Sequence, residues 1–198
     1  MFKGIIKDIG TITDITIHPN SDQIFHIETQ NLSSINKGDS ISCSGVCLTV
    51  VNIMSNVFTV QVSQETMKVS NLNTWKTGKK INLEQAMKLS DRIDGHLVQG
   101  HVDGIARILI IEQDLDSHEI KLSCTQELIK FVAKKGSVTL DGVSLTVNSV
   151  VDQEFTVNII PYTWKNTTFQ HNKTGNYLNL EVDMIARYLD QLIKYQHN

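Results

Sequence analysis

Short stretches of the chain alternate apolar and polar residues with a period of two. In the segment 46–50, three aliphatic residues alternate with Cys47 and Thr49, and the segment 58–62 is rich in β-branched residues. This period is typical of strands with one buried face. Turn signals rich in Gly, Asn, Ser and Asp punctuate the chain at 38–39, 44–45, 55–56, 78, 136, 141–142 and 175–176. The pattern predicts an all-β fold of short strands.

The chain also repeats itself. Residues 45–50 recur at 142–147, and the register then holds without a gap to Glu84 and Glu181, with 16 identities over the 40 positions 45–84 at an offset of 97. At an offset of 96 the opening matches as well, from Gly4 with Gly100 onward. The halves are roughly 1–87 and 97–183, and each has enough short strands for a small closed barrel, with a packed sandwich as the alternative.

Two segments have helical spacing instead. Thr125–Lys134 is predicted to be a short amphipathic helix that plugs or covers a barrel, with Gly136 just past its end. A second helix is predicted after Asp183, a candidate N-cap. Its apolar stripe has no obvious core of its own, so an oligomer contact is favoured over packing on the chain's own barrels; the stripe is Ile185, Tyr188, Leu189, Leu192 and Ile193.

Composition narrows the class of protein. The chain has 198 residues, of which 40% are hydrophobic, and a net charge of −3 without a long like-charge run. No basic surface for binding a nucleic-acid backbone is therefore expected. No apolar stretch approaches the ~20 residues that span a bilayer. The N-terminus lacks a signal-peptide block, and the three cysteines lack metal-ligand spacing, so a reducing cytoplasm is expected and no membrane partner.

A series of motifs makes the sequence resemble the tandem-barrel, alpha-type riboflavin synthases. The resemblance covers residue 1 to about 190 and rests on MFKGII at 1–6, GVCLTV at 45–50, ET at 65–66, GHLVQGHVDG at 95–104, KG at 135–136, DGVSLTV at 141–147, IP at 160–161 and NLEVD at 179–183. The order and spacing of these motifs, around a visible duplication, make it specific.

The resemblance implies two similar six-stranded Greek-key barrels, at 1–96 and 97–183, and a trimerisation helix at 184–198. It also implies a homotrimer that dismutates two molecules of 6,7-dimethyl-8-ribityllumazine into riboflavin and 5-amino-6-ribitylamino-pyrimidinedione, without a metal or organic cofactor. Each barrel is expected to bind one lumazine, and the reacting pair to meet between subunits. Two related pockets suit this chemistry, because holding two reactants together can contribute ~7–11 kcal/mol.

Donor and acceptor have different fates, so the pockets must differ. Cys47 stands opposite Ser144, Ile5 opposite His101, and Ser44 opposite Asp141. His101 is the candidate base that removes a proton from the 7-methyl group, with a structural histidine as the alternative. Cys47 is a candidate nucleophile or close contact, or else a small buried residue, and Ser40 is a further polar candidate for catalysis.

The family pattern also assigns residues to substrate binding. The first pocket is expected to take Gly4, Ile5, Ile6, Cys47, Leu48, Thr49, Gln61, Val62, Ser63, Gln64, Glu65 and Thr66. The second is expected to take Gly100, His101, Val102, Lys135, Ser144, Leu145, Thr146, Asn158, Ile159, Ile160, Pro161, Tyr162 and Thr163. Asp183 and Asp141 can hold a ribityl chain or orient a histidine, or they can equally be a helix cap and a turn residue.

Two rival readings remain. A metal site on His96, His101, Asp103 and Cys47 is disfavoured, because no close Cys/His pair exists to complete a zinc site. A non-catalytic lumazine or flavin carrier shares the fold, and fold alone does not separate carrier from enzyme. The enzyme is favoured because the second half keeps the enzyme pattern at both 100–102 and 141–146, whereas the second barrel of such carriers is expected to have drifted away from binding. Gln99, Ser44 and Tyr162 depart from the family's common residues without removing a proposed catalytic group.

Overall fold

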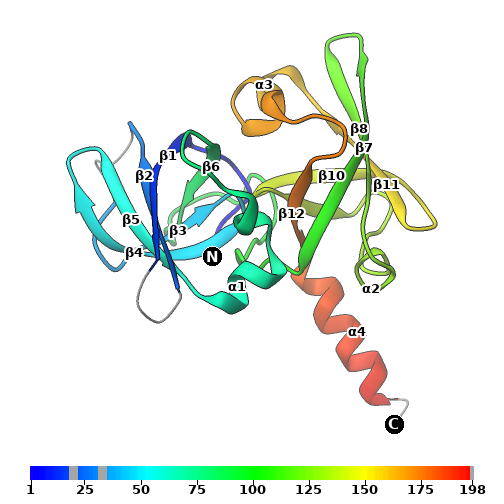
Figure 1. The fold of residues 1–198 in the computed structure, drawn as a ribbon. Helices are drawn as coiled ribbons and strands as arrows, with labels where there is room; N and C mark the ends of the chain where they lie inside the picture. The colour runs from blue at the N-terminus through cyan, green and yellow to red at the C-terminus, as the bar shows by residue number, and fades with distance from the viewer. Residues whose placement is uncertain (18–21, 31–34, 197–198) are drawn as a thin grey trace.

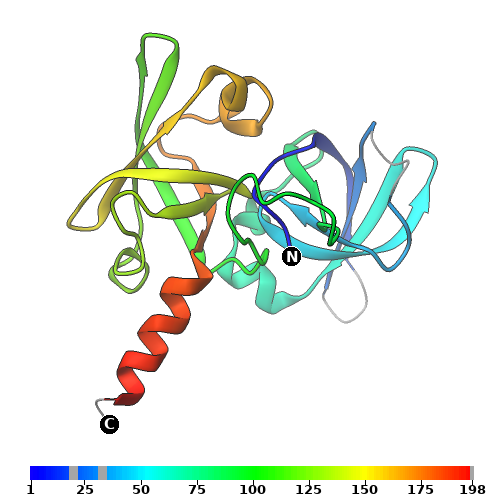
Figure 2. The same cartoon turned by 180° about the vertical axis from the view of Figure 1, so that it is seen from behind.

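The chain folds into two closed six-stranded antiparallel barrels and a C-terminal helix that projects from the second (Figure 1). This computed structural model describes residues 1–17, 22–30 and 35–196. Seen from behind, the barrels again lie side by side, with the N-terminus at the junction between them (Figure 2). The prediction of two tandem all-β barrels is confirmed, and the sandwich alternative is wrong.

The first barrel closes in the order β1, β2, β5, β4, β3, β6. A short helix, α1 (Gln64–Val69), and the 3-10 helix η2 (Asn71–Thr74) connect β5 to β6. The strands are β1 (Asp8–Ile17), β2 (Gln23–Glu28), β3 (Ser40–Cys43), β4 (Val46–Met54), β5 (Val57–Val62) and β6 (Lys80–Gln85).

The second barrel repeats this order as β7, β8, β11, β10, β9, β12. Its strands are β7 (Gly104–Asp114), β8 (Ser117–Ser123), β9 (Ser137–Leu140), β10 (Val143–Val151), β11 (Glu154–Ile159) and β12 (Tyr177–Val182). The helices α3 (Pro161–Lys165) and η3 (Thr168–His171) match α1 and η2. The repeat in the sequence is therefore a repeat of the whole topology.

Each barrel has its own apolar core, built from the inward face of alternating strand residues. In β4 the residues Val46, Leu48 and Val50 are buried, whereas Cys47 is half-buried and Thr49 is exposed. The alternation read from the sequence therefore separates core residues from outward ones, as a period of two requires.

Two equivalent hairpin turns bring the barrels together. Residues 44–45 and 141–142 all have positive φ, as two-residue turns of this kind need. The amide of Asn82 donates to the Asp141 carbonyl oxygen at 2.9 Å, and that of Asn179 donates to the Ser44 carbonyl oxygen at 2.8 Å. This buried polar contact relates the two halves by an approximate two-fold symmetry.

The helix expected over Thr125–Lys134 is shorter than predicted. Only α2 (Gln126–Ile129) is helical, and the chain then continues in turns to Gly136. Ile129 and Val132 are still buried in the core of the second barrel. Their apolar spacing is thus satisfied by a single helical turn followed by irregular chain, which periodicity alone does not distinguish from a longer helix.

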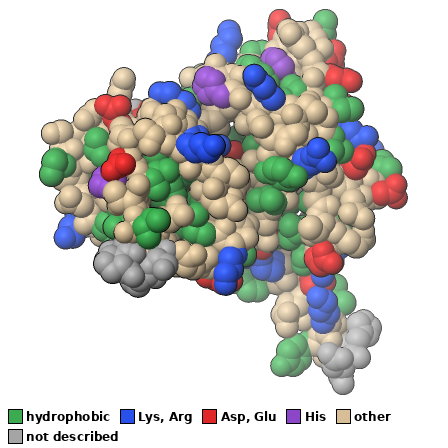
Figure 3. Space-filling model, in the orientation of Figure 1, with side chains coloured by type: hydrophobic (Ala, Val, Ile, Leu, Met, Phe, Trp, Pro, Cys, Tyr) green, Lys and Arg blue, Asp and Glu red, His purple; other side chains and the backbone are tan. Residues whose placement is uncertain are grey.

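The C-terminal helix α4 (Met184–Gln196) is present where it was expected, and residues 197–198 lie outside the described part of the chain. None of its residues is buried. Figure 3 shows hydrophobic side chains along this projecting helix. Its apolar face includes Ile185 at 68%, Leu189 at 55% and Leu192 at 63% exposure, so it has no partner within the described chain. No helix among the described residues has the length and apolarity needed to cross a membrane.

Candidate active site

The first group of candidate residues lies on the outer face of the first barrel. Ser40 pairs with Thr49 across β3 and β4, and Val50 pairs with Val60, which places Thr49 beside Gln61. At the end of β5, Ser63 caps α1, whose Thr66 N–H donates to the Ser63 hydroxyl at 3.3 Å. The strand ends and α1 thus bring these predicted residues together in one surface patch, which we call the first site: Ser40, Cys47, Thr49, Gln61, Ser63 and Thr66.

The second barrel carries the corresponding patch. Ser144 pairs with Thr139 across β10 and β9, and Val147 pairs with Val157, which places Thr146 beside Asn158. The helix α3 follows β11 as α1 follows β5, and it carries Tyr162, which is 75% exposed. The second site is this patch: Thr139, Ser144, Thr146, Asn158, Tyr162 and Thr163.

Four predicted binding residues point away from these patches. Their side chains are buried in the two barrel cores, so they offer a ligand only their backbone groups. Gln64 and Glu65 are exposed on α1, and Glu65 pairs with Lys68 on the same helix. The inward-facing residues are Leu48 and Val62 in the first barrel and Leu145 and Ile159 in the second.

The two glycine segments, 4–6 and 100–102, each lie at the opposite site from the one predicted. The prediction that 4–6 lie with Cys47 and that 100–102 lie with Ser144 is wrong. The Gly100 carbonyl oxygen accepts from the Cys47 N–H at 2.8 Å, and the Gly4 carbonyl oxygen accepts from the Ser144 N–H at 2.8 Å. The side chains agree, because Ile6 packs against the second core and Val102 against the first. Each site is therefore completed by the other half of the chain.

Glycine is required at both crossings. Gly4 and Gly100 have φ of 74° and 76°, which side-chain-bearing residues rarely adopt. An added Cβ would lie 2.5 Å from the Ser144 Cβ at Gly4 and 2.6 Å from the Cys47 Cβ at Gly100. Only a residue without a side chain lets each segment lie directly against the partner strand.

Two buried glutamates, for which the sequence predicts no role, hold the exchanged segments. Glu84 accepts from the N–H groups of Lys3 and Gly4 at 2.9 and 3.0 Å. Glu181 accepts from those of Gln99 and Gly100 at 2.7 and 2.8 Å. Burial raises the pKa of both carboxyls, and these hydrogen bonds oppose the rise. Their presence at matching positions of the repeat was the available signal.

The thiol and the histidine of the first site are not in an activated pair. Burial raises the pKa of the Cys47 thiol, more than its hydrogen bond with Ser40 lowers it. The thiol is therefore protonated at neutral pH. This favours a role for Cys47 as a close contact of the substrate over a role as a thiolate nucleophile. The His101 side chain is exposed on the segment 100–102, which lies against Cys47, so a bound ligand can reach it.

The second site contains His96, for which the sequence offers only a disfavoured role as a metal ligand. His96 Nδ1 lies 2.7 Å from Ser144 Oγ, and Nε2 lies 3.1 Å from Thr139 Oγ1. Burial lowers the pKa of His96, although the charge of Asp183 opposes this, so the ring is neutral at neutral pH. A neutral imidazole beside a hydroxyl can accept its proton, which is the arrangement of a general base with its nucleophile or donor.

Two further predicted residues, Lys135 and Asp183, lie next to strands of the second barrel. Lys135 is exposed in the turn before β9. The Asp183 carboxylate accepts from the Ile185 N–H at 2.9 Å, which makes it a helix cap, and it is close enough to influence His96. Among the described residues, no group of three His, Cys, Asp or Glu side chains is placed to hold a metal.

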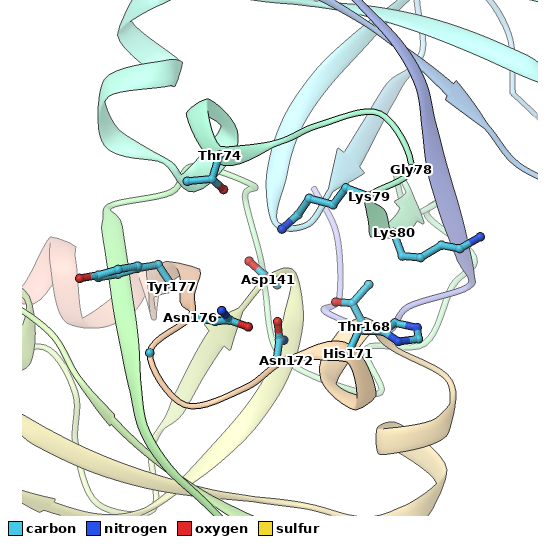
Figure 4. A pocket seen from close by; sticks show the side chains of 11 residues that line it. Thr74, Gly78, Lys79, Lys80, Asp141, Thr168, His171, Asn172, Asn176 and Tyr177 are labelled. Atoms are coloured by element: carbon cyan, nitrogen blue, oxygen red, sulfur yellow. The ribbon is translucent and has the colours of Figure 1, made fainter.

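A cavity of about 490 Å³ lies between the barrels, but it does not coincide with either site (Figure 4). Asp141 lines it, and Figure 4 shows Lys79 pointing toward that carboxyl. Asp141 also accepts from the Asn179 N–H at 2.8 Å, and burial raises its pKa to about 7. Asp141 therefore belongs to the contact between the barrels, and the turn reading of this residue fits the structure.

Comparison with known proteins identifies the family. The Lumazine binding domain model matches the chain twice, at residues 3–86 and 99–183. A riboflavin synthase of Brucella abortus is 44% identical over 99% of this chain and 100% of its own length. One of Bacillus amyloliquefaciens is 41% identical over 96% of this chain and 88% of its own length. One of Schizosaccharomyces pombe is 35% identical over 98% and 94%.

Solved structures agree on the fold. The crystal structure of LumP complexed with riboflavin has a TM-score of 0.86 and covers 92% of this chain and 100% of that one, at 23% sequence identity. LumP complexed with 6,7-dimethyl-8-(1'-D-ribityl) lumazine has a TM-score of 0.84 at the same identity. At this identity the likeness shows the barrels alone. With two domain matches and full-length relatives at 35–44% identity, the chain belongs to the riboflavin synthase family.

Proposed function

We propose that this chain is a riboflavin synthase, which transfers a four-carbon unit between two molecules of 6,7-dimethyl-8-ribityllumazine. The observation that carries the proposal is the pair of half-sites on equivalent strands, each completed by a segment from the other half. A reaction between two copies of one substrate needs two related binding sites. Both sites keep the hydroxyl, backbone and glycine framework that a pyrimidinedione edge and a ribityl chain can use.

The two sites supply different chemistry, as donor and acceptor require. The second site has Ser144 within hydrogen-bond distance of neutral His96, which suits removal of a proton or activation of a hydroxyl or water. The first site offers the exposed ring of His101 beside a protonated thiol. His101 is the group that we propose removes the proton from the 7-methyl group of a lumazine in the first site.

We further propose a homotrimer in which the first site of one subunit meets the second site of a neighbour. The exposed apolar face of α4 supports an oligomer, because a bare stripe of this length is otherwise costly in water. The reaction is expected to need no metal or organic cofactor, since proton transfer and positioning are available from the side chains. The three free cysteines fit the reducing cytoplasm that we propose as its location.

The experiment that tests this function is incubation of the purified protein with the lumazine alone, in the presence of a chelator. We expect one riboflavin for every two lumazines consumed. A non-catalytic carrier would bind the lumazine and give no riboflavin, and that result would overturn the enzyme proposal. Unchanged turnover with the chelator supports the absence of a metal, whereas loss that added metal restores would contradict it.

A further inference from the structure

Arg187 connects the C-terminal helix to the wall of the first site. It lies on α4, and its guanidinium donates to the Gln99 side-chain oxygen at 3.0 Å and to the Asp103 carboxylate at 2.7 Å. These two acceptors flank the segment 100–102, which carries His101. A planar guanidinium bridging both ends fixes their separation better than a single contact does.

The contacts continue from this segment to the thiol of the first site. Asp103 also accepts from the Val182 N–H at 2.8 Å, and Glu181 accepts from the Gln99 and Gly100 N–H groups. The Gly100 carbonyl oxygen then accepts from the Cys47 N–H. A continuous series of polar contacts therefore runs from α4 to Cys47.

Within residues 1–17, 22–30 and 35–196, no guanidinium bridges the corresponding wall of the second site in this way. Segment 4–6 is held by the Glu84 carboxylate, which accepts from the Lys3 and Gly4 N–H groups. The nearby ion pair joins Lys3 to Asp94 at 3.9 Å, and the Asp94 side chain is 58% exposed. This pair contributes little, because its charged atoms are far apart and the Asp94 carboxylate is exposed to water. Among the residues that the structure describes, α4 therefore supports the wall of the first site and not that of the second.

We propose that Arg187 is a positioning residue that holds the His101 wall of the first site against Cys47, and so couples the docking of α4 in the oligomer to the geometry of that site. The helix carries an apolar face that is free in the single chain, and Arg187 lies within the same helix. Packing of α4 against neighbouring subunits restricts the guanidinium, and through it the segment 99–103. The catalytic part of this inference rests on the proposed function; the structural part does not.

The test uses the full-length protein with Arg187→Gln, and it measures the rate at which iodoacetamide alkylates Cys47, read by peptide mass spectrometry. Cys43 and Cys124 are buried and serve as internal references. Loosening of the segment 99–103 should speed alkylation of Cys47 at least about threefold. Misplacement of His101 should lower kcat about tenfold, whereas binding of lumazine at the second site should be unchanged. Arg187→Lys should be intermediate, because an ammonium cannot form the fork.

Lys130→Gln is the matched control. Lys130 pairs with Asp190 of α4 at 3.4 Å, so it anchors the same helix without touching the segment 99–103. The Lys130→Gln variant should show the Cys47 alkylation rate and the kcat of the wild type. The inference is overturned if Arg187→Gln behaves as the wild type, or if Lys130→Gln speeds alkylation by the same factor.

A further variant covers the case in which Arg187→Gln dissociates the oligomer. Gln99→Met removes one arm of the fork and leaves the pair of Arg187 with Asp103 intact. We expect a smaller rise in Cys47 alkylation with the oligomer preserved, and no rise would overturn the inference. If the wild type forms no riboflavin, the proposed function fails, yet the alkylation comparison still decides whether Arg187 holds the wall.

Discussion

The two candidate sites share a backbone frame and differ in the groups that the frame presents. Both have a glutamate clamp, a glycine crossing and the same strand register. The first presents a protonated thiol near an exposed histidine, whereas the second presents Ser144 within hydrogen-bond distance of half-buried His96. The duplication thus keeps the backbone frame and changes the side chains that it presents, which is what the proposed donor and acceptor roles require.

The histidines give the largest expected difference between the sites. His96→Gln and His101→Gln should each lower kcat by about 10²–10⁴-fold, because each removes a proposed proton-transfer group. Steady-state assays with the lumazine measure this. The control is His171→Gln, an exposed histidine outside both sites, which should keep wild-type turnover. Wild-type turnover in His96→Gln would contradict the role assigned to the second site.

Removal of α4 tests whether the two sites work within one chain. Truncation after Asp183 should give monomers and lower turnover about a hundredfold, since the pairing of sites supplies the proximity of the reactants. Light scattering gives the mass, and equilibrium titration should still show lumazine binding to the barrels. A monomer with full activity would show that the sites pair without a second chain.

Asp141 and Ser44 occupy equivalent turns and predict a difference in pH dependence. The folded-state pKa of Asp141 is raised from 3.8 to about 7 by burial, so its contribution to stability is present at low pH and is lost as the pH rises from about 4 to about 7. Asp141→Asn keeps the acceptor for the Asn179 N–H and removes the loss of stability at rising pH, because an amide does not titrate.

We therefore expect the Asn variant to be more stable than the wild type at pH 8 by up to about 4 kcal/mol, with the difference vanishing near pH 4. Urea unfolding across this pH range measures it. Ser44→Ala is the comparison, because the serine does not titrate and its effect should not vary with pH. A wild-type advantage that grows with pH would contradict the assignment.

Cys47→Ser is expected to have the smallest effect. It places in the first site the residue that the second site already has, and the thiol is protonated at neutral pH. Turnover should change by less than about threefold, because no thiolate nucleophile is removed. A loss as large as that of the histidine variants would show that thiol chemistry is part of the reaction.

Much of the fold was predictable because the repeat and the period-two alternation are both local signals. Val46, Leu48 and Val50 identify a buried strand face, and their recurrence at 143–147 identifies a second copy. The stripe on 185–193 identifies an unpartnered helix in the same way. Helix length at 125–134 was overestimated, because buried Ile129 and Val132 fit both a helix and a turn-rich segment.

The site was predictable in its residue types and not in its assembly. The repeat is equally well satisfied whether Gly4 lies beside Cys47 or beside Ser144, so only three-dimensional contacts reveal the exchange. The role of His96 was missed for the same reason, since the hydroxyls that it contacts are 43 and 48 positions away in the chain. The clamp glutamates were visible as repeated residues, but a buried carboxylate that binds backbone N–H groups leaves no distinct sequence pattern.

The central claim is that unlike half-sites from neighbouring subunits form one reaction centre, and complementation tests it most directly. His101→Gln impairs the first site and His96→Gln the second, so oligomers assembled by co-expression of both variants contain some neighbours whose facing sites are both intact. With random mixing we expect about a quarter of wild-type turnover, since a pair needs one particular subunit at each of two positions. Mixed oligomers with no more activity than the separate variants would contradict the claim.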